Sequence, residues 1–313
     1  MTQAMEFVPS LEEFGFKKAD IALAKDKRAC YDFVGGEDQG VKRLREYIFE
    51  TKSVGSYALT RNNLIGANYS SKLSPWLACG ALSPRYIYFQ VKEFEEKHRS
   101  NESTKVFLDE LFWRDFYRFW CMKYGNKVFS AYGIYNREYY KWATDPDIVK
   151  RWRQGQTGIP IIDALMREMN QTGFMPNRGR MIVACYFAMD LRQDWRHGAY
   201  YFEEKLIDHD VQSNYGGWCF SAGIGPGRVL VFNSVKQSKD HDKNGDYIKM
   251  WCPELKRVPV EYIHEPWTMP KELQKGCKTL IGEDYPEPIA CEKYTAKGKG
   301  QIRAKSLGDV AHL

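Results

Sequence analysis

The sequence lacks several patterns that mark common classes of protein. None of its eight cysteines belongs to a C-x-x-C pair or shows a Cys/His ligand spacing, so we expect reduced, mostly buried thiols, no disulfide framework and no metal site. No apolar run approaches the roughly 18 residues of a membrane span. The N-terminus resembles neither a signal peptide nor a transit peptide. These absences predict a soluble, intracellular protein in a compartment that the sequence does not specify.

Phosphate-binding loops and strands are also scarce. The chain contains neither a Walker motif nor a G-x-G-x-x-G motif. Polar/apolar alternation is rare, and its best strand candidate, 228–235, could equally be irregular. Helical periodicity dominates instead: 160–169 begins with Pro160 and is followed by Gly173, whereas 180–191 is apolar all round and predicts a buried helix. We therefore predict an all-α fold of many helices with little or no β-sheet.

Composition and charge set the domain organisation. Hydrophobic residues make up 43% and aromatic residues 15%, which is typical of a folded protein, and the net charge of +6 weakly favours a polyanionic partner. We predict an entry segment over 1–40 with one short helix at most, a helical domain over 41–290 and a flexible basic tail over 291–313. The tail could contact nucleic acid or an acidic surface, or simply be a solvated terminus.

The most informative segment is DHDVQSNYGGW (208–218), read together with MPNRGRM (175–181). The first combines two acids, an amide, a glycine pair and an indole. In the second, Asn177, Arg180 and Met181 share one helix face. A buried acid needs a guanidinium or several donors to stay ionised, so we predict that Arg180 pairs with Asp208.

Two further segments could line a pocket. In YSSKLSPWLACG (69–80), Ser74 followed by Pro75 predicts an N-cap and a helix that continues through WLACGAL (76–82). The start of this helix could bind a diphosphate or could merely be capped. In DELFWRDFYRFW (109–120), one face carries an acid, a base and two aromatic rings. That face could be a pocket wall, or an amphipathic helix with an intrahelical ion pair. The face comprises Glu110, Trp113, Arg114 and Tyr117.

Three tryptophans, Trp142, Trp195 and Trp218, lie 53 and 23 residues apart. These separations alone indicate no function, since most buried tryptophans simply belong to a core.

Together these segments resemble the FAD-binding helical domain of the photolyase/cryptochrome family. The resemblance extends from about residue 31 to 289, with the motifs in family order. They are YSSKLSPWLACGALSPR, LFWRDFYRF, TGIPIIDALMREMNQTGF, MPNRGRM, DWRHGAYYFEEKLIDHDVQSNYGGW, WCPELKRVP and HEPW. KYGN, FMPNRGR and VKQSKDHDKNGDYIKMW are most similar to the DASH cryptochromes. Met181 and the glycine pair are closer to the cyclobutane-dimer photolyases.

The resemblance implies FAD as the cofactor. Arg180 matches the arginine over the flavin ring, paired with the acid at Asp208. Asn214 matches the residue facing flavin N5, where an amide is typical of photolyases and suits a reduced flavin. Trp218, Trp195 and Trp142 match an electron-transfer triad at the family's spacing. The cofactor-binding residues so implied are Tyr57, Ser70, Ser71, Lys72, Ser74, Phe107, Glu110, Arg114, Asn177, Arg180, Asp208, Asp210 and Asn214.

The implied reaction is the blue-light-driven repair of cyclobutane pyrimidine dimers in damaged or single-stranded DNA, in which the dimer leaves the base stack. The residues expected at the reacting dimer are Glu110, Trp113, Asn177, Met181 and Asn214. DNA contacts are expected from Arg61, Trp113, Arg178 and Arg228. A (6-4) photolyase activity is not expected, because Met175 and Pro176 occupy the positions of its paired histidines.

Two departures from the family pattern leave other interpretations open. The family's N-terminal antenna domain is absent, so we expect no antenna chromophore, and a protein partner could cover the exposed face. The 221–233 segment is shorter than usual, with Leu230 at a position that is usually basic and Phe220 at one that is often Trp or Tyr. The chain could therefore be a dimer photolyase, a flavin photoreceptor or redox protein without repair, or a scaffold subunit that retains only the fold.

Overall fold

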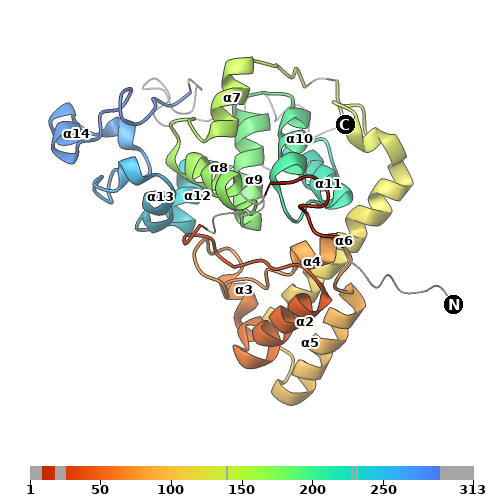
Figure 1. Cartoon of the computed structure of the whole chain (residues 1–313). Helices are drawn as coiled ribbons and strands as arrows, with labels where there is room; N and C mark the ends of the chain where they lie inside the picture. The colour runs from red at the N-terminus through yellow and green to blue at the C-terminus, as the bar shows by residue number, and fades with distance from the viewer. Residues whose placement is uncertain (1–8, 18–25, 139, 227–228, 230–231, 290–313) are drawn as a thin grey trace.

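The computed structural model describes residues 9–17, 26–138, 140–226, 229 and 232–289. Within these ranges the chain is built from helices joined by loops of varied length (Figure 1). The helices are α2 (Glu37–Arg45), α3 (Tyr57–Thr60), α4 (Ser74–Ala78), α5 (Pro84–His98), α6 (Glu102–Tyr124), α7 (Pro146–Gln154), α8 (Pro160–Thr172), α9 (Asn177–Cys185), α10 (Trp195–Lys205), α11 (Val211–Ser221), α12 (Ser234–His241), α13 (Asp246–Trp251), α14 (Lys271–Cys277), η1 (Glu46–Glu50), η2 (Ser53–Ser56), η3 (Gly125–Phe129), η4 (Tyr186–Asp190), η5 (Pro253–Leu255) and η6 (Pro266–Thr268).

The predicted all-α fold is confirmed. In the described part of the chain, β-structure is limited to two isolated bridges, Ala143–Gln193 and Ile281–Tyr285. Of the strand candidate 228–235, residues 228, 230 and 231 lie outside the described ranges, and the rest is irregular until α12 begins at Ser234. No described helix combines the length and apolar character that crossing a lipid bilayer requires.

Local signals explain most helix boundaries. Pro160 lies in the first turn of α8, and Gly173 ends it with a φ of 70°, as predicted. The predicted buried helix over 180–191 is α9 continued by η4, and its apolar side chains lie in the core. Helix α2 crosses the predicted boundary at residue 40. The predicted tail, 291–313, lies outside the described residues.

The buried hydrophobic side chains of the described residues form two clusters. One gathers side chains from α7 to α11 and α13, and the other gathers side chains from α2 to the first half of α6. Figure 1 shows α2–α5 together at the bottom and α7–α11 together at the top, with α6 running past both groups. Helix α6 contacts α3 and α5 on one side and α11 on the other. The functional site lies where these two groups of helices meet.

The described cysteines are all free thiols, and four of them are buried. Burial raises the pKa of Cys30 and Cys121 to about 11, which disfavours the reactive thiolate at neutral pH. Cys291 lies outside the described residues.

Candidate functional site

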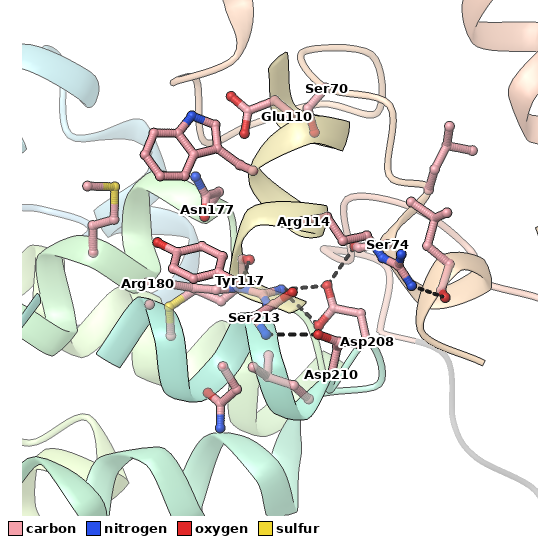
Figure 2. A pocket seen from close by; sticks show the side chains of 18 of the residues that line it. Ser70, Ser74, Glu110, Arg114, Tyr117, Asn177, Arg180, Asp208, Asp210 and Ser213 are labelled. Carbon is pink, nitrogen blue, oxygen red and sulfur yellow. Dashed lines mark hydrogen bonds and ion pairs between the residues drawn. The ribbon is translucent and has the colours of Figure 1, made fainter. Parts of the chain in front are cut away.

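A cavity of about 510 Å³ opens between the two groups of helices (Figure 2). Its size falls within the range of cofactor-binding clefts. It draws together residues that are up to about 160 positions apart in the sequence, from the loop before α4, from α6, from α9 and from α11. Every predicted cofactor-binding residue lines it: Tyr57, Ser70, Ser71, Lys72, Ser74, Phe107, Glu110, Arg114, Asn177, Arg180, Asp208, Asp210 and Asn214.

The floor of the cavity is a closed network around Asp208. Arg180 donates from Nη2 to both oxygens of this carboxylate, at 2.8 and 3.0 Å, and Ser74 Oγ donates to Oδ2 at 2.6 Å. Arg180 is itself held by a bond from its Nε to the Met175 carbonyl. The Asp208 side chain is only 1% exposed, so these charge-assisted bonds compensate its desolvation. The predicted Arg180–Asp208 pair is confirmed.

The predicted role of Ser74 as a helix cap is wrong. Leu73 occupies the N-cap position of α4, no side chain caps this end, and the Ser74 hydroxyl bonds Asp208 instead. The expected continuation of the helix is also wrong: α4 ends at Ala78, and Gly80 has a φ of 75°. A five-residue helix offers little dipole, so any affinity for phosphate here depends on side chains.

The loop before α4 carries those side chains. Lys72 is buried, adopts a φ of 60°, and places its ammonium 2.9 Å from the centre of the Tyr69 ring and 3.3 Å from Ser70 Oγ. Burial lowers the pKa of Lys72 to about 7. The loop is fixed from behind by the fully buried Arg43, which donates to the backbone carbonyls of Ser71, Ser70 and Ala67. Sequence reasoning missed Arg43.

Helix α11 begins at the second acid. Asp210 accepts a hydrogen bond from the Ser213 backbone N–H at 2.8 Å and so caps the helix. One turn on, Asn214 lines the cavity while its Nδ2 donates to the Ala199 carbonyl at 3.0 Å. This bond fixes the orientation of the amide at the cavity wall. Ser213, which also lines the cavity, was not predicted.

The two glycines of the GGW motif have different roles. A Cβ on Gly216 would come within 2.2 Å of the Tyr117 ring, so this glycine lets α11 pack closely against α6. A Cβ on Gly217 would meet no atom within 4 Å and would enter the cavity. Gly217 therefore preserves volume for a ligand.

The predicted face of α6 is a cavity wall, and the alternative of an intrahelical ion pair is wrong. Glu110 pairs with Arg61, which lies 49 residues earlier, rather than with Arg114. Burial raises the pKa of Glu110, while Arg61 opposes that shift. Arg114 donates to the Leu77 carbonyl, and its other nitrogen, Nη1, is buried with no partner in the described chain.

Several polar atoms at the cavity are buried without a partner among the described residues. They are Nη1 of Arg114, both ring nitrogens of His209 and Nε1 of Trp218. Such groups are costly unless a ligand satisfies them. Together with the donors of the loop before α4 and the open space beside Gly217, they fit a large polar ligand with an extended ring system, as FAD is. Sequence reasoning missed His209, although it lies between the two predicted acids.

The three predicted electron-transfer tryptophans occupy one side of the fold. Trp218 lines the cavity, and its ring abuts α10, where a Cβ on Gly198 would come within 2.1 Å of it. Trp195 lies one turn earlier on α10. The indoles of Trp195 and Trp142 both donate to the Ala131 carbonyl, at 3.0 and 2.8 Å. The structure thus brings together three residues whose spacing alone was uninformative.

The more exposed side of the cavity, here called its mouth, holds some of the residues predicted to contact a substrate. Trp113 is 50% exposed and lines the cavity, as do Asn177 and Met181. Arg61 also lines the cavity, whereas Arg178 lies outside it and donates to the side chain of Asn62. Phe220 reaches the cavity as well. Arg228 and Leu230 lie outside the described residues.

Comparisons with known proteins agree with this geometry. A family model described as the FAD binding domain of DNA photolyase matches residues 107–301. Cryptochrome DASH of Synechocystis sp. is 45% identical over 288 residues, which cover 91% of this chain and 58% of that protein. Cryptochrome DASH of Xenopus laevis is 44% identical, with 90% and 53% covered.

Solved structures give the same result. A Synechocystis cryptochrome superposes with a TM-score of 0.84 at 47% identity and covers 86% of this chain and 56% of that chain. A class III photolyase from Agrobacterium tumefaciens superposes with a TM-score of 0.81 at 30% identity, with 90% and 58% covered. The chain therefore spans about half the length of the relatives that it matches.

Proposed function

The chain belongs to the photolyase/cryptochrome family, and on that premise we propose that it binds FAD in this cavity and uses blue light to repair cyclobutane pyrimidine dimers in DNA. The observation that carries the proposal is the single cavity that unites the Asp208 network, the unpartnered polar atoms and the half-exposed Trp113. The floor suits a cofactor, and the mouth suits a substrate that contacts it.

The residues that would hold FAD fall into two groups. Ser70, Ser71 and Lys72 supply donors for a diphosphate on the side that Arg43 fixes. Arg180 and Asn214 form the second group, and each is held in place by a bond that it makes to the protein. Because these side chains are positioned in advance, binding costs little side-chain ordering.

Bound FAD would supply a light-absorbing redox centre that passes one electron to the dimer and takes it back. The chain's own contribution at the mouth is to hold the dimer. Trp113 offers an aromatic face for stacking, Glu110 a carboxyl group for hydrogen bonding, and Met181 an apolar contact beside Asn177. Trp218 at the cavity wall, followed by Trp195 and Trp142, supports electron supply from the surface.

A second function also has an observation in its favour. Arg61, expected at DNA, is paired with Glu110, and three of the four relatives named above carry the name cryptochrome. A flavin photoreceptor or redox protein without repair would need the cofactor cavity and the tryptophans, but it would not need residues at the mouth to bind DNA. The two functions therefore differ in whether the mouth binds a DNA substrate.

Repair of a single-stranded oligonucleotide containing one thymine dimer, under blue light with a thiol reductant, distinguishes them. We expect restored thymines with the FAD-loaded wild-type chain, and much slower repair with Glu110→Gln. Glu102→Gln, an exposed change in the first turn of the same helix, is the matched control and should repair normally. Photoreduction of the flavin without repair would support a photoreceptor or redox function. A chain that binds no flavin would support the third alternative, a scaffold subunit.

A further inference from the structure

Tyr215 on α11 lies at the centre of an aromatic chain that leads away from the tryptophans. Its ring centre is 6.1 Å from that of Trp195, at an interplanar angle of 81°, and 6.3 Å from that of Tyr200, at 65°. Tyr215 is 4% exposed, whereas Tyr200 is 51% exposed. An unbroken series of ring contacts therefore connects the buried Trp195 to the protein surface through Tyr215.

The Tyr215 phenol also has a proton acceptor. Its hydroxyl donates to Glu203 Oε2 at 3.1 Å. Burial and then the nearby Glu203 charge raise the pKa of Tyr215 well above its usual value, so the phenol is protonated in the resting protein. A phenol that loses an electron becomes a strong acid, and a carboxylate within hydrogen-bond reach can take its proton at once. Tyr215 is therefore placed to lose an electron and a proton together.

Trp195 consequently has two aromatic exits. One is Trp142, which shares the Ala131 carbonyl with it and stacks on Tyr140 at 5.0 Å and 5°. The other is Tyr215. The exits differ chemically, because an indole can carry a positive hole while keeping its proton, whereas a phenol cannot. The second exit places a phenol in direct ring contact with Trp195 and a carboxylate at that phenol, so it couples electron transfer from Trp195 to proton transfer in one step.

We propose that Trp195 is a branch point, at which Tyr215 donates an electron and thereby stores the oxidising equivalent as a phenoxyl radical before Tyr200 delivers it to the surface. This inference rests on the proposed light-driven electron transfer through Trp218. It adds to that scheme a second exit, a proton acceptor and a surface residue at which reduction takes place.

Photoexcited FAD, when bound, would accept an electron from Trp218. That electron is replaced from Trp195, which becomes a radical cation. Tyr215 gives its electron to that cation and its proton to the Glu203 carboxylate, which leaves neutral Trp195, a phenoxyl radical and a neutral carboxyl group. Tyr200 then supplies an electron and releases its proton to water, while Glu203 returns the stored proton to Tyr215. A thiol finally gives a hydrogen atom to the Tyr200 radical and becomes a thiyl radical.

The first test uses the FAD-loaded chain and a blue-light flash, followed by transient absorption and freeze-trapped electron paramagnetic resonance. We expect a phenoxyl signal in the wild type. Tyr215→Phe keeps the ring that packs against Phe129 at 4.6 Å but removes the phenol, and should lose most of the signal and shorten the charge-separated state severalfold. Tyr86→Phe, an exposed change on α5, is the matched control. An unchanged phenoxyl yield in Tyr215→Phe would overturn the proposal.

The second test needs no cofactor. Azide radicals from pulse radiolysis oxidise tryptophans of the FAD-free chain, and the decay of indolyl absorption is compared with the growth of phenoxyl absorption. We expect a growth phase that Tyr215→Phe reduces and that Glu203→Gln slows, because glutamine cannot accept the proton. If neither variant changes this phase, the branch does not exist. A variant-sensitive phase in a chain that binds no FAD would support the branch and contradict the proposed function instead.

Discussion

The cavity contains two arginine–carboxylate pairs that share a chemistry but differ in their surroundings. At the floor, the side chains of Arg180 and Asp208 are 24% and 1% exposed. At the mouth, those of Arg61 and Glu110 are 35% and 36% exposed. Figure 2 shows Glu110 near the top of the view and Asp208 lower down, so the two carboxylates are well separated in it. A buried pair is costly to break, while an exposed pair rearranges easily. We therefore infer that the Arg180–Asp208 end is a rigid part of the cofactor-binding site, whereas the Arg61–Glu110 end can rearrange when a substrate binds.

The largest expected effect comes from breaking the floor pair. Arg180→Ala leaves the Asp208 carboxylate buried with Ser74 as its remaining side-chain partner, and should lower the free energy of unfolding by about 3–5 kcal/mol. Arg61→Ala is the matched change at the mouth and should cost about 0–1 kcal/mol. Urea unfolding of the FAD-free proteins measures both. Equal costs would contradict the distinction between floor and mouth.

The adjacent glycines of α11, Gly216 and Gly217, allow packing and cofactor volume to be tested separately within one helix. Gly216→Ala pushes against the Tyr117 ring and should destabilise the protein by about 1–3 kcal/mol. Gly217→Ala meets open space and should stabilise the FAD-free helix by up to about 1 kcal/mol, yet weaken FAD binding because its methyl group enters the cavity. Thermal unfolding and FAD titration separate the two effects. If Gly217→Ala bound FAD as tightly as the wild type, the cavity volume there would not belong to the cofactor.

Lys72 makes the cofactor-binding site sensitive to pH. Its neighbours are Cys30 and Glu168, which raise its pKa, and Arg43 and Arg180, which lower it, but burial dominates and brings the pKa to about 7. A diphosphate favours the ammonium form, so FAD affinity should fall as pH rises above about 7, by at most about tenfold per pH unit. The free energy of unfolding of the FAD-free protein has the opposite pH dependence. It falls as pH falls from 10.5 toward 7, because over this range Lys72 is protonated in the unfolded chain but largely neutral in the folded protein.

FAD titrations between about pH 6 and pH 9 test this prediction, because this range extends roughly one unit below and two units above the pKa of Lys72. Lys72→Arg keeps its charge throughout, so its affinity should not depend on pH over this range. The same pH dependence in the wild type and in Lys72→Arg would show that another group is responsible.

The smallest effect on stability is expected at Glu110. Glu110→Gln should change the free energy of unfolding by less than about 1 kcal/mol, since the side chains of its ion pair are 35% and 36% exposed. Repair should nevertheless slow by about tenfold or more, which corresponds to the loss of one hydrogen bond to a charged group, ~1.5 kcal/mol. Rate measurements on a dimer-containing oligonucleotide test this. Unimpaired repair would remove Glu110 from the substrate contacts.

Local patterns in the sequence predicted the fold, and the resemblance to the photolyase/cryptochrome family predicted most of the cavity residues. Periodicity and the Pro160 and Gly173 signals define α8, and the motifs on α6, α9 and α11 place their side chains on single faces. These features need no knowledge of distant contacts.

The sequence could not identify partners that are far apart along the chain. Ser-Pro at a helix start has the same pattern whether the hydroxyl caps the helix or, as here, bonds Asp208 134 residues away. Arg43 lies in a helix of ordinary charge pattern, and only the tertiary fold places it under the loop at Ser71. The Glu110–Arg61 pair likewise depends on how α3 and α6 pack.

The decisive measurement is the flavin content of the purified full chain. Wild type, Arg61→Ala and Arg180→Ala are purified in parallel, incubated with FAD, and compared by absorption before and after blue light with a thiol. We expect stoichiometric, photoreducible flavin in the wild type and in Arg61→Ala, and no bound flavin in Arg180→Ala. A wild-type chain that does not bind FAD, or an Arg180→Ala variant that retains FAD as well as the wild type, would contradict the proposed FAD-binding site.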